Sequence, residues 1–159
     1  MKRVLGVDPG TLRTGWGVVE RRGTRMLHLG HGVIQPAPGL DLADRLLAIF
    51  DGLGQVLAEH APAYVAVEDV FHARFAQAAL KLGHARGVSL LCAARAGLSV
   101  RAYPPALVKR TIAGYGRADK TQVQRMVTAL LGLDEIPPVD AADALAIAIC
   151  HCNAIEGIE

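Results

Sequence analysis

The fold of this chain is decided by Val4-Leu5-Gly6-Val7-Asp8-Pro9-Gly10. An apolar run that meets Asp, Pro and Gly is typical of a buried strand stopping in a turn. Residues 15–20 and the alternating residues 25–34 predict two more strands, with a hairpin at 21–23 between them. The glycines of the second run indicate close backbone approach or a bulge. Three successive strands predict an antiparallel meander at the start of the chain.

Helices and strands alternate after this meander. A helix is expected after Asp41, because apolar residues recur at helical spacing as far as Val56, and Pro62 lies beyond its end. Residues 64–67 predict a fourth, buried strand, and residues 100–103 predict a fifth. Further helices are expected at about 73–96, 107–112, 119–131 and 140–153. Strand–helix–strand units favour parallel pairing, so we predict an α/β fold with a five-stranded mixed sheet flanked by helices.

Length and composition indicate a single domain. The chain has 159 residues, of which 52% are hydrophobic, and this suits one compact core spanning 1–159. No apolar run reaches the roughly 20 residues that span a bilayer, and the N-terminus has no signal-peptide pattern. Cys92, Cys150 and Cys152 lack the spacing of a disulfide framework. We therefore expect a protein of the reducing cytoplasm, with no membrane partner.

Charge is distributed unevenly along the chain. Between Asp69 and Asp119 there is no acidic residue, whereas this stretch carries eight of the 17 basic residues. Such a segment favours a surface for a polyanion such as nucleic acid. The alternative is a solvated helix whose long side chains cover apolar surface. Lys81 and Arg86, on the helix expected at 73–96, are candidates for phosphate contacts.

Four carboxylates stand where one crevice would collect them. Asp8 and Glu68 each end a predicted strand, and the functional crevice of an open α/β sheet lies at the carboxyl ends of its parallel strands. Asp140 and Asp143 are three residues apart, which places both on one face of a helix. Taken singly, Asp8 also suits a turn and Asp140 a helix N-cap. Glu68 follows a buried run and needs a partner.

Four converging acids repel one another unless a cation lies between them. Ligation by oxygen alone favours Mg²⁺ or Mn²⁺ over Zn²⁺. Two such ions about 4 Å apart activate a water and stabilise the leaving oxygen in phosphodiester hydrolysis. The residues alone therefore predict a two-metal phosphodiesterase with the ligands Asp8, Glu68, Asp140 and Asp143.

Four segments follow one another along nearly the whole chain: residues 6–10 with Thr14-Gly15-Trp16-Gly17, residues 67–71, residues 79–87, and residues 140–148. Together they resemble the RuvC family of bacterial Holliday-junction resolvases. The resemblance implies a ribonuclease-H-like fold, a homodimer, and paired symmetric nicks in two opposing strands of a four-way DNA junction, in recombination and repair. It also implies that the four acids form the metal site.

The resemblance assigns roles to further residues. Phe71 matches a phenylalanine near the junction centre, and Lys109 and Lys120 match basic residues near the cleaved phosphate. An aromatic side chain in such a loop stacks on an unpaired base, whereas ordinary core packing is expected for Phe75. Asp69 departs from the family pattern, since many relatives carry an uncharged residue there. The implied protein partners are a junction-binding protein and a branch-migration ATPase.

Several other residues attract notice without predicting chemistry. Cys150-His151-Cys152 resembles a metal motif, but residues at i and i+2 of a helix do not face each other, so no zinc site is expected. His151 lies two turns beyond Asp143 on the same helical face, and a packing role is expected. His28 and His31 fall on a strand, and we expect them to point to opposite faces.

Three other functions fit parts of the pattern. A ribonuclease-H-like nuclease acting on RNA–DNA hybrids or other branched DNA would share the metal chemistry. Residues 8–11 are similar to the phosphate loop of actin-like ATPases, but such proteins need two domains of this kind. A non-catalytic junction binder would keep the basic stretch and gain nothing from four acids that repel DNA.

Overall fold

The computed structural model describes residues 2–69 and 75–155. Its strands are β1 (Lys2–Asp8), β2 (Thr14–Arg22), β3 (Arg25–Ile34), β4 (Tyr64–Glu68) and β5 (Val100–Tyr103). Its helices are α1 (Leu42–His60), α2 (Ala76–Arg95), α3 (Pro105–Ala113), α4 (Lys120–Leu131) and α5 (Val139–Ala154). The predicted order of strands and helices is confirmed.

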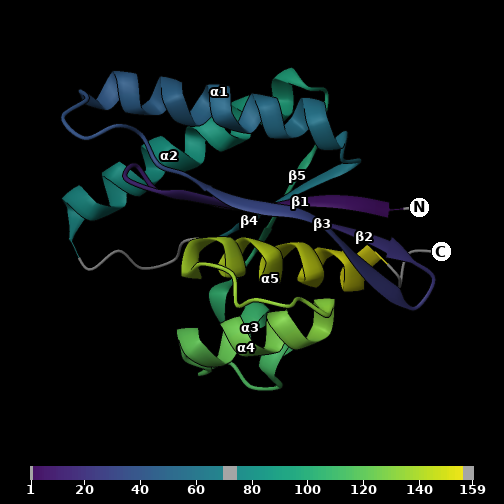
Figure 1. Cartoon of the computed structure of the whole chain (residues 1–159). Helices are drawn as coiled ribbons and strands as arrows, with labels where there is room; N and C mark the ends of the chain where they lie inside the picture. Colours follow the sequence, from purple (N-terminus) through teal and green to yellow (C-terminus); the bar gives the residue numbers. More distant parts are fainter. Residues whose placement is uncertain (1, 70–74, 156–159) are drawn as a thin grey trace.

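The strands form one mixed sheet in the order β3-β2-β1-β4-β5 (Figure 1). β1 pairs antiparallel with β2, and β2 pairs antiparallel with β3, as expected for a meander. β4 is parallel to both β1 and β5. The predicted five-stranded mixed sheet is therefore confirmed, and β1 and β4 are the neighbouring parallel strands in its middle.

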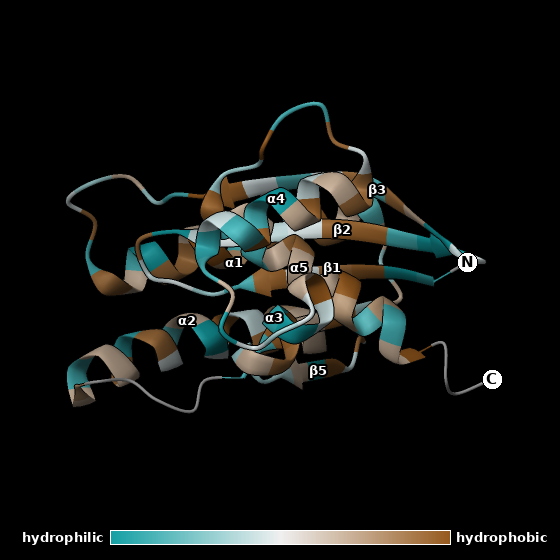
Figure 2. Cartoon of the chain, turned by 90° about the horizontal axis from the view of Figure 1, so that it is seen from below, coloured by the Kyte–Doolittle hydropathy of each residue, from teal (hydrophilic) through white to brown (hydrophobic). Residues whose placement is uncertain are grey.

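Helices cover both faces of this sheet. α1 and α2 lie on one face, and α5 lies on the other with α3 and α4 stacked beneath it (Figure 1). Seen from below, α5 lies between α3 and α4 and carries few hydrophilic residues (Figure 2). Because strand side chains alternate between faces, Leu5 and Val7 pack toward α1, whereas Val4 packs toward α5. Among the described residues, no helix has the length and apolar character needed to cross a membrane.

The close packing of α5 on the sheet depends on glycines in β1 and β2. A Cβ atom at Gly6 would collide with the backbone oxygen of Ala144, and one at Gly15 with that of Asp140. At Gly17 the collision would be with Leu145. The predicted close backbone approach is confirmed, and it brings the first turn of α5 to the carboxyl end of β1.

Three helix starts differ slightly from the predicted ones. α2 begins at Ala76, because Phe75 takes the extended N-cap conformation with φ −138° and ψ 145°. α3 begins at Pro105, since proline is well suited to the first helical turn. α5 begins at Val139, which places Asp140 inside the first turn rather than at the N-cap. Asp119 and Gln122 form a capping box at the start of α4.

Two expectations about side chains were wrong. Phe75 is 71% exposed rather than packed in the core, because it precedes α2 and lies beyond the segment of that helix that packs on α1. His28 and His31 lie on the same side of β3, with His28 Nε2 2.8 Å from His31 Nδ1. The reason is a β-bulge: Val19 pairs with His28 and Val18 with Gly30, so Leu29 is an extra residue that inverts the alternation.

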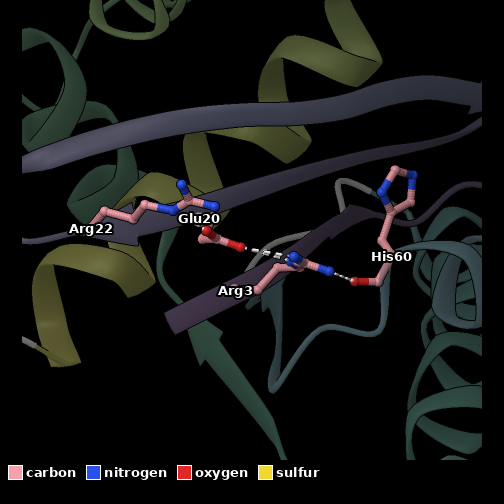
Figure 3. A network of polar contacts seen from close by, with 4 residues as sticks. All are labelled: Arg3, Glu20, Arg22 and His60. Atoms are coloured by element: carbon pink, nitrogen blue, oxygen red, sulfur yellow. Dashed lines mark hydrogen bonds and ion pairs between the residues drawn. The ribbon is translucent and has the colours of Figure 1, made fainter. Parts of the chain in front are cut away.

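A buried ion pair ties the far end of the meander to α1 (Figure 3). Glu20 is 1% exposed, and its Oε2 accepts hydrogen bonds from Arg3 Nε and Nη2 at 3.0 and 2.8 Å. Arg22 Nε donates to the other oxygen at 2.5 Å. Arg3 also donates to the carbonyl of His60 at the end of α1. These hydrogen bonds lower the pKa of Glu20, so this acid is satisfied by its neighbours and belongs to the scaffold.

Candidate active site

Asp8 and Glu68 meet because two parallel strands end side by side. Val7 of β1 is in register with Val67 of β4, and each strand continues for one more residue, an acid. Within each strand the acid shares a face with the residue two positions earlier, Gly6 or Ala66, and this is the face that α5 covers. The alternation of the strands therefore directs both acids toward α5.

Asp143 completes this arrangement from α5. The side chains of Asp8, Glu68 and Asp143 line one cavity of about 220 Å³, whose floor includes Ala146 and Ile147 of the same helix. Asp140, one turn earlier on α5, is close enough to raise the pKa of both Asp8 and Asp143. The structure thus brings together the four acids selected from the sequence.

Two lysines supply positive charge to the same cavity. Lys109 of α3 and Lys120, the first residue of α4, both line it. Each lowers the pKa of Glu68 and of Asp143 by electrostatic attraction. Both residues are far from the acids in the sequence. The packing of α3 and α4 against α5 places them there.

The cavity holds more negative charge than these lysines offset. The pKa of Asp8 is raised to about 8, mainly by burial and further by repulsion from Asp143, Glu68 and Asp140. The pKa values of Glu68 and Asp143 are also raised, in both cases mainly by burial. A cluster of this kind binds a cation or a proton readily, and strongly perturbed acids in a cleft are a common mark of a functional site.

The donor set fits a hard divalent cation. It offers carboxylate oxygens without Cys or His, the ligands that Mg²⁺ and Mn²⁺ prefer. In the described part of the chain, no three acidic, His or Cys side chains already close around a single point as metal ligands. Closure around an ion would therefore require these carboxylate side chains to move closer together.

One residue at this site was not identified from the sequence. Arg13 lies in the loop between β1 and β2, and its Nε is 3.4 Å from Asp140 Oδ2. The loop is closed by Thr14, whose hydroxyl donates to the carbonyl of Gly10 at 2.8 Å and accepts from its N–H at 3.2 Å. The only sequence signal for Arg13 is its place just after the Asp-Pro-Gly turn, and this does not reveal its partner on α5.

Two further candidates for DNA binding, Lys81 and Arg86, are not among the residues that line this cavity. Lys81 is exposed on α2. Arg86, on the same helix, is half-buried, and its Nη2 is 3.8 Å from Oδ1 of Asp69. Asp69, the departure from the family pattern, is therefore next to an arginine, and its N–H donates to the carbonyl of Tyr103 at 2.7 Å. Phe71 lies outside the described residues.

The Cys150-His151-Cys152 segment is part of the core. Burial raises the pKa of the Cys152 thiol to about 11 and also raises that of Cys150. His151 is 3% exposed, its Nδ1 is 2.5 Å from the hydroxyl of Tyr103, and its ring contacts Tyr64 edge-on. The expected packing role of His151 is confirmed.

A mixed sheet in this order, with acids ending its two central parallel strands and a carboxylate-bearing helix across them, defines the ribonuclease-H-like class. A RuvC from Thermus thermophilus, solved in complex with a Holliday junction substrate, matches the structure with a TM-score of 0.91 at 39% identity, covering 99% of this chain and 97% of that one. The chain belongs to the family described as crossover junction endodeoxyribonuclease RuvC, whose model matches residues 4–151.

Individual relatives are similar over almost their full length. The crossover junction endodeoxyribonuclease RuvC of Sorangium cellulosum is 56% identical over 152 residues, covering 96% of this chain and 85% of the relative. The crossover junction endodeoxyribonuclease RuvC of Syntrophotalea carbinolica is 53% identical over 151 residues, covering 95% of this chain and 94% of the relative. Family membership makes this protein a nuclease, and the predicted resemblance is confirmed.

Proposed function

We propose that this chain is a metal-dependent endonuclease that resolves four-way DNA junctions. The observation that carries the proposal is the convergence of Asp8, Glu68 and Asp143 on one cavity that Lys109 and Lys120 also line. Its substrate is inferred from the family. The relatives are crossover junction endodeoxyribonucleases, and the Thermus thermophilus RuvC was solved with a Holliday junction.

Asp8, Glu68, Asp140 and Asp143 would hold two Mg²⁺ or Mn²⁺ ions. The raised pKa of Asp8 supports this assignment, because burial first and then repulsion from Asp143, Glu68 and Asp140 disfavour its ionised form, and a divalent cation would offset both effects. When bound, the ions supply an activated water and stabilise the leaving oxygen in phosphodiester hydrolysis. As a metal ligand Asp140 would give up its contact with Arg13, and Arg13 would then be able to meet the DNA backbone.

The lysines bind the phosphate that is cut. Without them a phosphodiester entering a cavity of carboxylates would be repelled. Lys109 and Lys120 reach the cavity from α3 and α4. They hold the phosphate against the acids and offset the charge that develops as the P–O bond breaks.

Resolution of a junction requires cuts in two opposing strands, so we propose a homodimer in which each copy cuts one strand. Lys81 and Arg86 extend the positive surface along α2, and Phe71 stacks on an unpaired base near the junction centre. A junction-binding protein and a branch-migration ATPase are the proposed partners in the cell, and recombination and repair the proposed context.

The first test separates catalysis from binding. Asp8→Asn and Glu68→Gln should each lower the rate of cleavage of a synthetic four-way junction by at least about 10³-fold in Mg²⁺ or Mn²⁺, because loss of a ligand disrupts the bound ions. Junction affinity in a gel-shift assay should stay unchanged, since the basic residues remain. Asp51→Asn, an exposed acid on α1, is the matched control. Nicking retained in either site variant contradicts the assignment.

Product analysis distinguishes junction resolution from the related activity on RNA–DNA hybrids. We expect paired nicks at symmetric positions in opposing strands of the junction. Faster cleavage of a linear RNA–DNA hybrid would show that the same metal chemistry serves a different substrate.

Phe71→Ala tests the proposed stacking contact. We expect junction cleavage to fall by about 5–150-fold, the loss that corresponds to roughly 1–3 kcal/mol of stacking. The melting temperature should stay within about 1 °C of the unaltered protein if the residue serves DNA rather than the core. An equal loss of stability and activity would assign Phe71 to packing instead.

A further inference from the structure

The two histidines that the bulge brings together lie in a cavity of their own. This cavity, about 590 Å³ in volume, is lined by residues of β3 and by the segment 131–138, which connects α4 to α5. His28 and His31 form one wall, and Asp134 and Glu135 belong to the segment that closes the cavity. It shares no lining residue with the carboxylate cavity.

The two facing ring nitrogens are hydrogen-bonded, and they are close enough to share one metal ion once the rings turn. His28 Nε2 and His31 Nδ1 are 2.8 Å apart, and the ring centroids are 4.9 Å apart. With metal–nitrogen bonds of about 2.1 Å, this separation corresponds to an angle of about 85° at the metal. The angle between neighbouring ligands of an octahedral or square-planar ion is close to this value. The rings need to turn until their lone pairs converge, and both side chains are half-buried beside an open volume.

The surroundings of both imidazoles favour the neutral form, which metal ligation requires. Burial lowers the pKa of His28 and of His31, and for His28 the neighbouring His31 and His60 lower it further. In the hydrogen-bonded pair one of the two facing nitrogens carries a proton. When that proton moves to the other nitrogen of the same ring, both facing nitrogens present lone pairs, and no proton is released.

We propose that His28 and His31 form a second metal site, which takes a borderline transition metal such as Ni²⁺, Co²⁺ or Zn²⁺. Imidazole ligands favour these ions over Mg²⁺, which the carboxylates favour. Among the described residues no third His, Cys or acid is in place to complete a protein-only site. Water fills the remaining positions, and Asp134 and Glu135 attract the cation into the cavity.

Equilibrium dialysis of tag-free protein against Ni²⁺, with excess Mg²⁺ to saturate the carboxylates, tests this proposal. We expect a single Ni²⁺ ion per chain in the unaltered protein. His28→Gln and His31→Gln should each abolish this binding, because glutamine keeps a hydrogen-bonding group and is a poor ligand. His84→Gln, a half-exposed histidine on α2, is the matched control and should bind like the unaltered protein. Absence of binding in the unaltered protein, or binding retained in either pair variant, overturns the proposal.

A measurement on the unaltered chain guards against a folding defect in the variants. Imidazole ¹⁵N spectra recorded with Zn²⁺ and excess Mg²⁺ should identify Nε2 of His28 and Nδ1 of His31 as the nitrogens that shift on metal binding. Shifts at other histidines, with none at this pair, overturn the site. Cleavage activity is not the readout, so failure here is distinguishable from failure of the proposed nuclease function.

Discussion

At Asp8, burial and three neighbouring acids act in the same direction. The side chain is held at the end of β1 by strand pairing on both sides, and it faces α5 because Gly6, two residues earlier, faces α5. A pKa of about 8 is the electrostatic consequence. A cation in the carboxylate cavity should therefore favour the ionised form of this residue.

The pKa of Asp8 determines how stability depends on pH in the metal-free protein. Between its ordinary value of 3.8 and about 8, the folded chain keeps a proton that the unfolded chain has lost. The free energy of unfolding therefore falls as pH rises through this window. Glu68 and Asp143, whose pKa values are also raised, contribute with the same sign.

Asp8→Asn removes this charge and should stabilise the metal-free protein at pH 8. We expect a gain of about 2 kcal/mol, or roughly 4–8 °C in melting temperature. Thermal melts with a chelator between pH 5 and 9 measure it, and the variant should show a shallower decline than the unaltered protein. If the melting temperatures of the two proteins fall equally with rising pH, the pKa of Asp8 is not raised in the folded protein. Added Mg²⁺ should stabilise the unaltered protein and have less effect on the variant.

At the scale of elements, α5 connects the core to the candidate site. It packs across β1 and β2 through small residues on both sides, and its first turn carries Asp140 and Asp143. The apolar residues that follow these acids along α5 are buried against the sheet. Their burial fixes the helix and thereby the position of the two carboxylates. α3 and α4 then pack on α5 and bring Lys109 and Lys120 to the cavity.

Gly6→Ala tests whether this close packing is needed. The new Cβ would meet the backbone oxygen of Ala144, which cannot move without shifting α5, so we expect a loss of about 3 kcal/mol. Gly54→Ala is the matched control, because that glycine lies in α1 with nothing within 4 Å of a Cβ, and it should gain up to about 1 kcal/mol. Urea denaturation measures both. Equal stability of the two variants would show that α5 adjusts freely.

At the scale of the whole molecule, the number of sites matters. The described residues of one chain form one carboxylate cavity of this composition. Resolution of a junction, in contrast, requires cuts in two strands. The proposed homodimer resolves this mismatch. Each copy would then act on its own strand, and paired cutting would depend on both sites.

A mixture of unaltered protein and excess Asp8→Asn chains tests the dimer. Exchange of subunits should yield dimers with a single working site, which nick one strand and leave the junction unresolved. Denaturing and native gels of the same reaction separate nicked from resolved products. If the amount of paired cutting instead depends only on the amount of unaltered chain and is not reduced by the excess variant, a single copy performs both cuts.

Much of the fold and of the candidate site was predictable from the sequence. The ends of β1 and β4 were marked by acids after apolar runs, and the spacing of Asp140 and Asp143 placed both on one helix face. The glycines of β2 indicated close packing. These signals come from residues within a strand or a helical turn of one another, where backbone geometry alone fixes the direction of side chains.

Only the tertiary structure decided which distant groups meet. Arg13 faces Asp140, and His28 joins His31 through a bulge that depends on pairing with β2. The exposure of Phe75 depends on where α2 begins relative to its packing on α1. The physical reason is the range of the interactions. Periodicity and turn chemistry act between near neighbours, whereas these contacts arise from the docking of segments that no local pattern describes. The four carboxylates were therefore selected from the chain itself, and the cavity that gathers Asp8, Glu68 and Asp143 with two lysines was decided by packing.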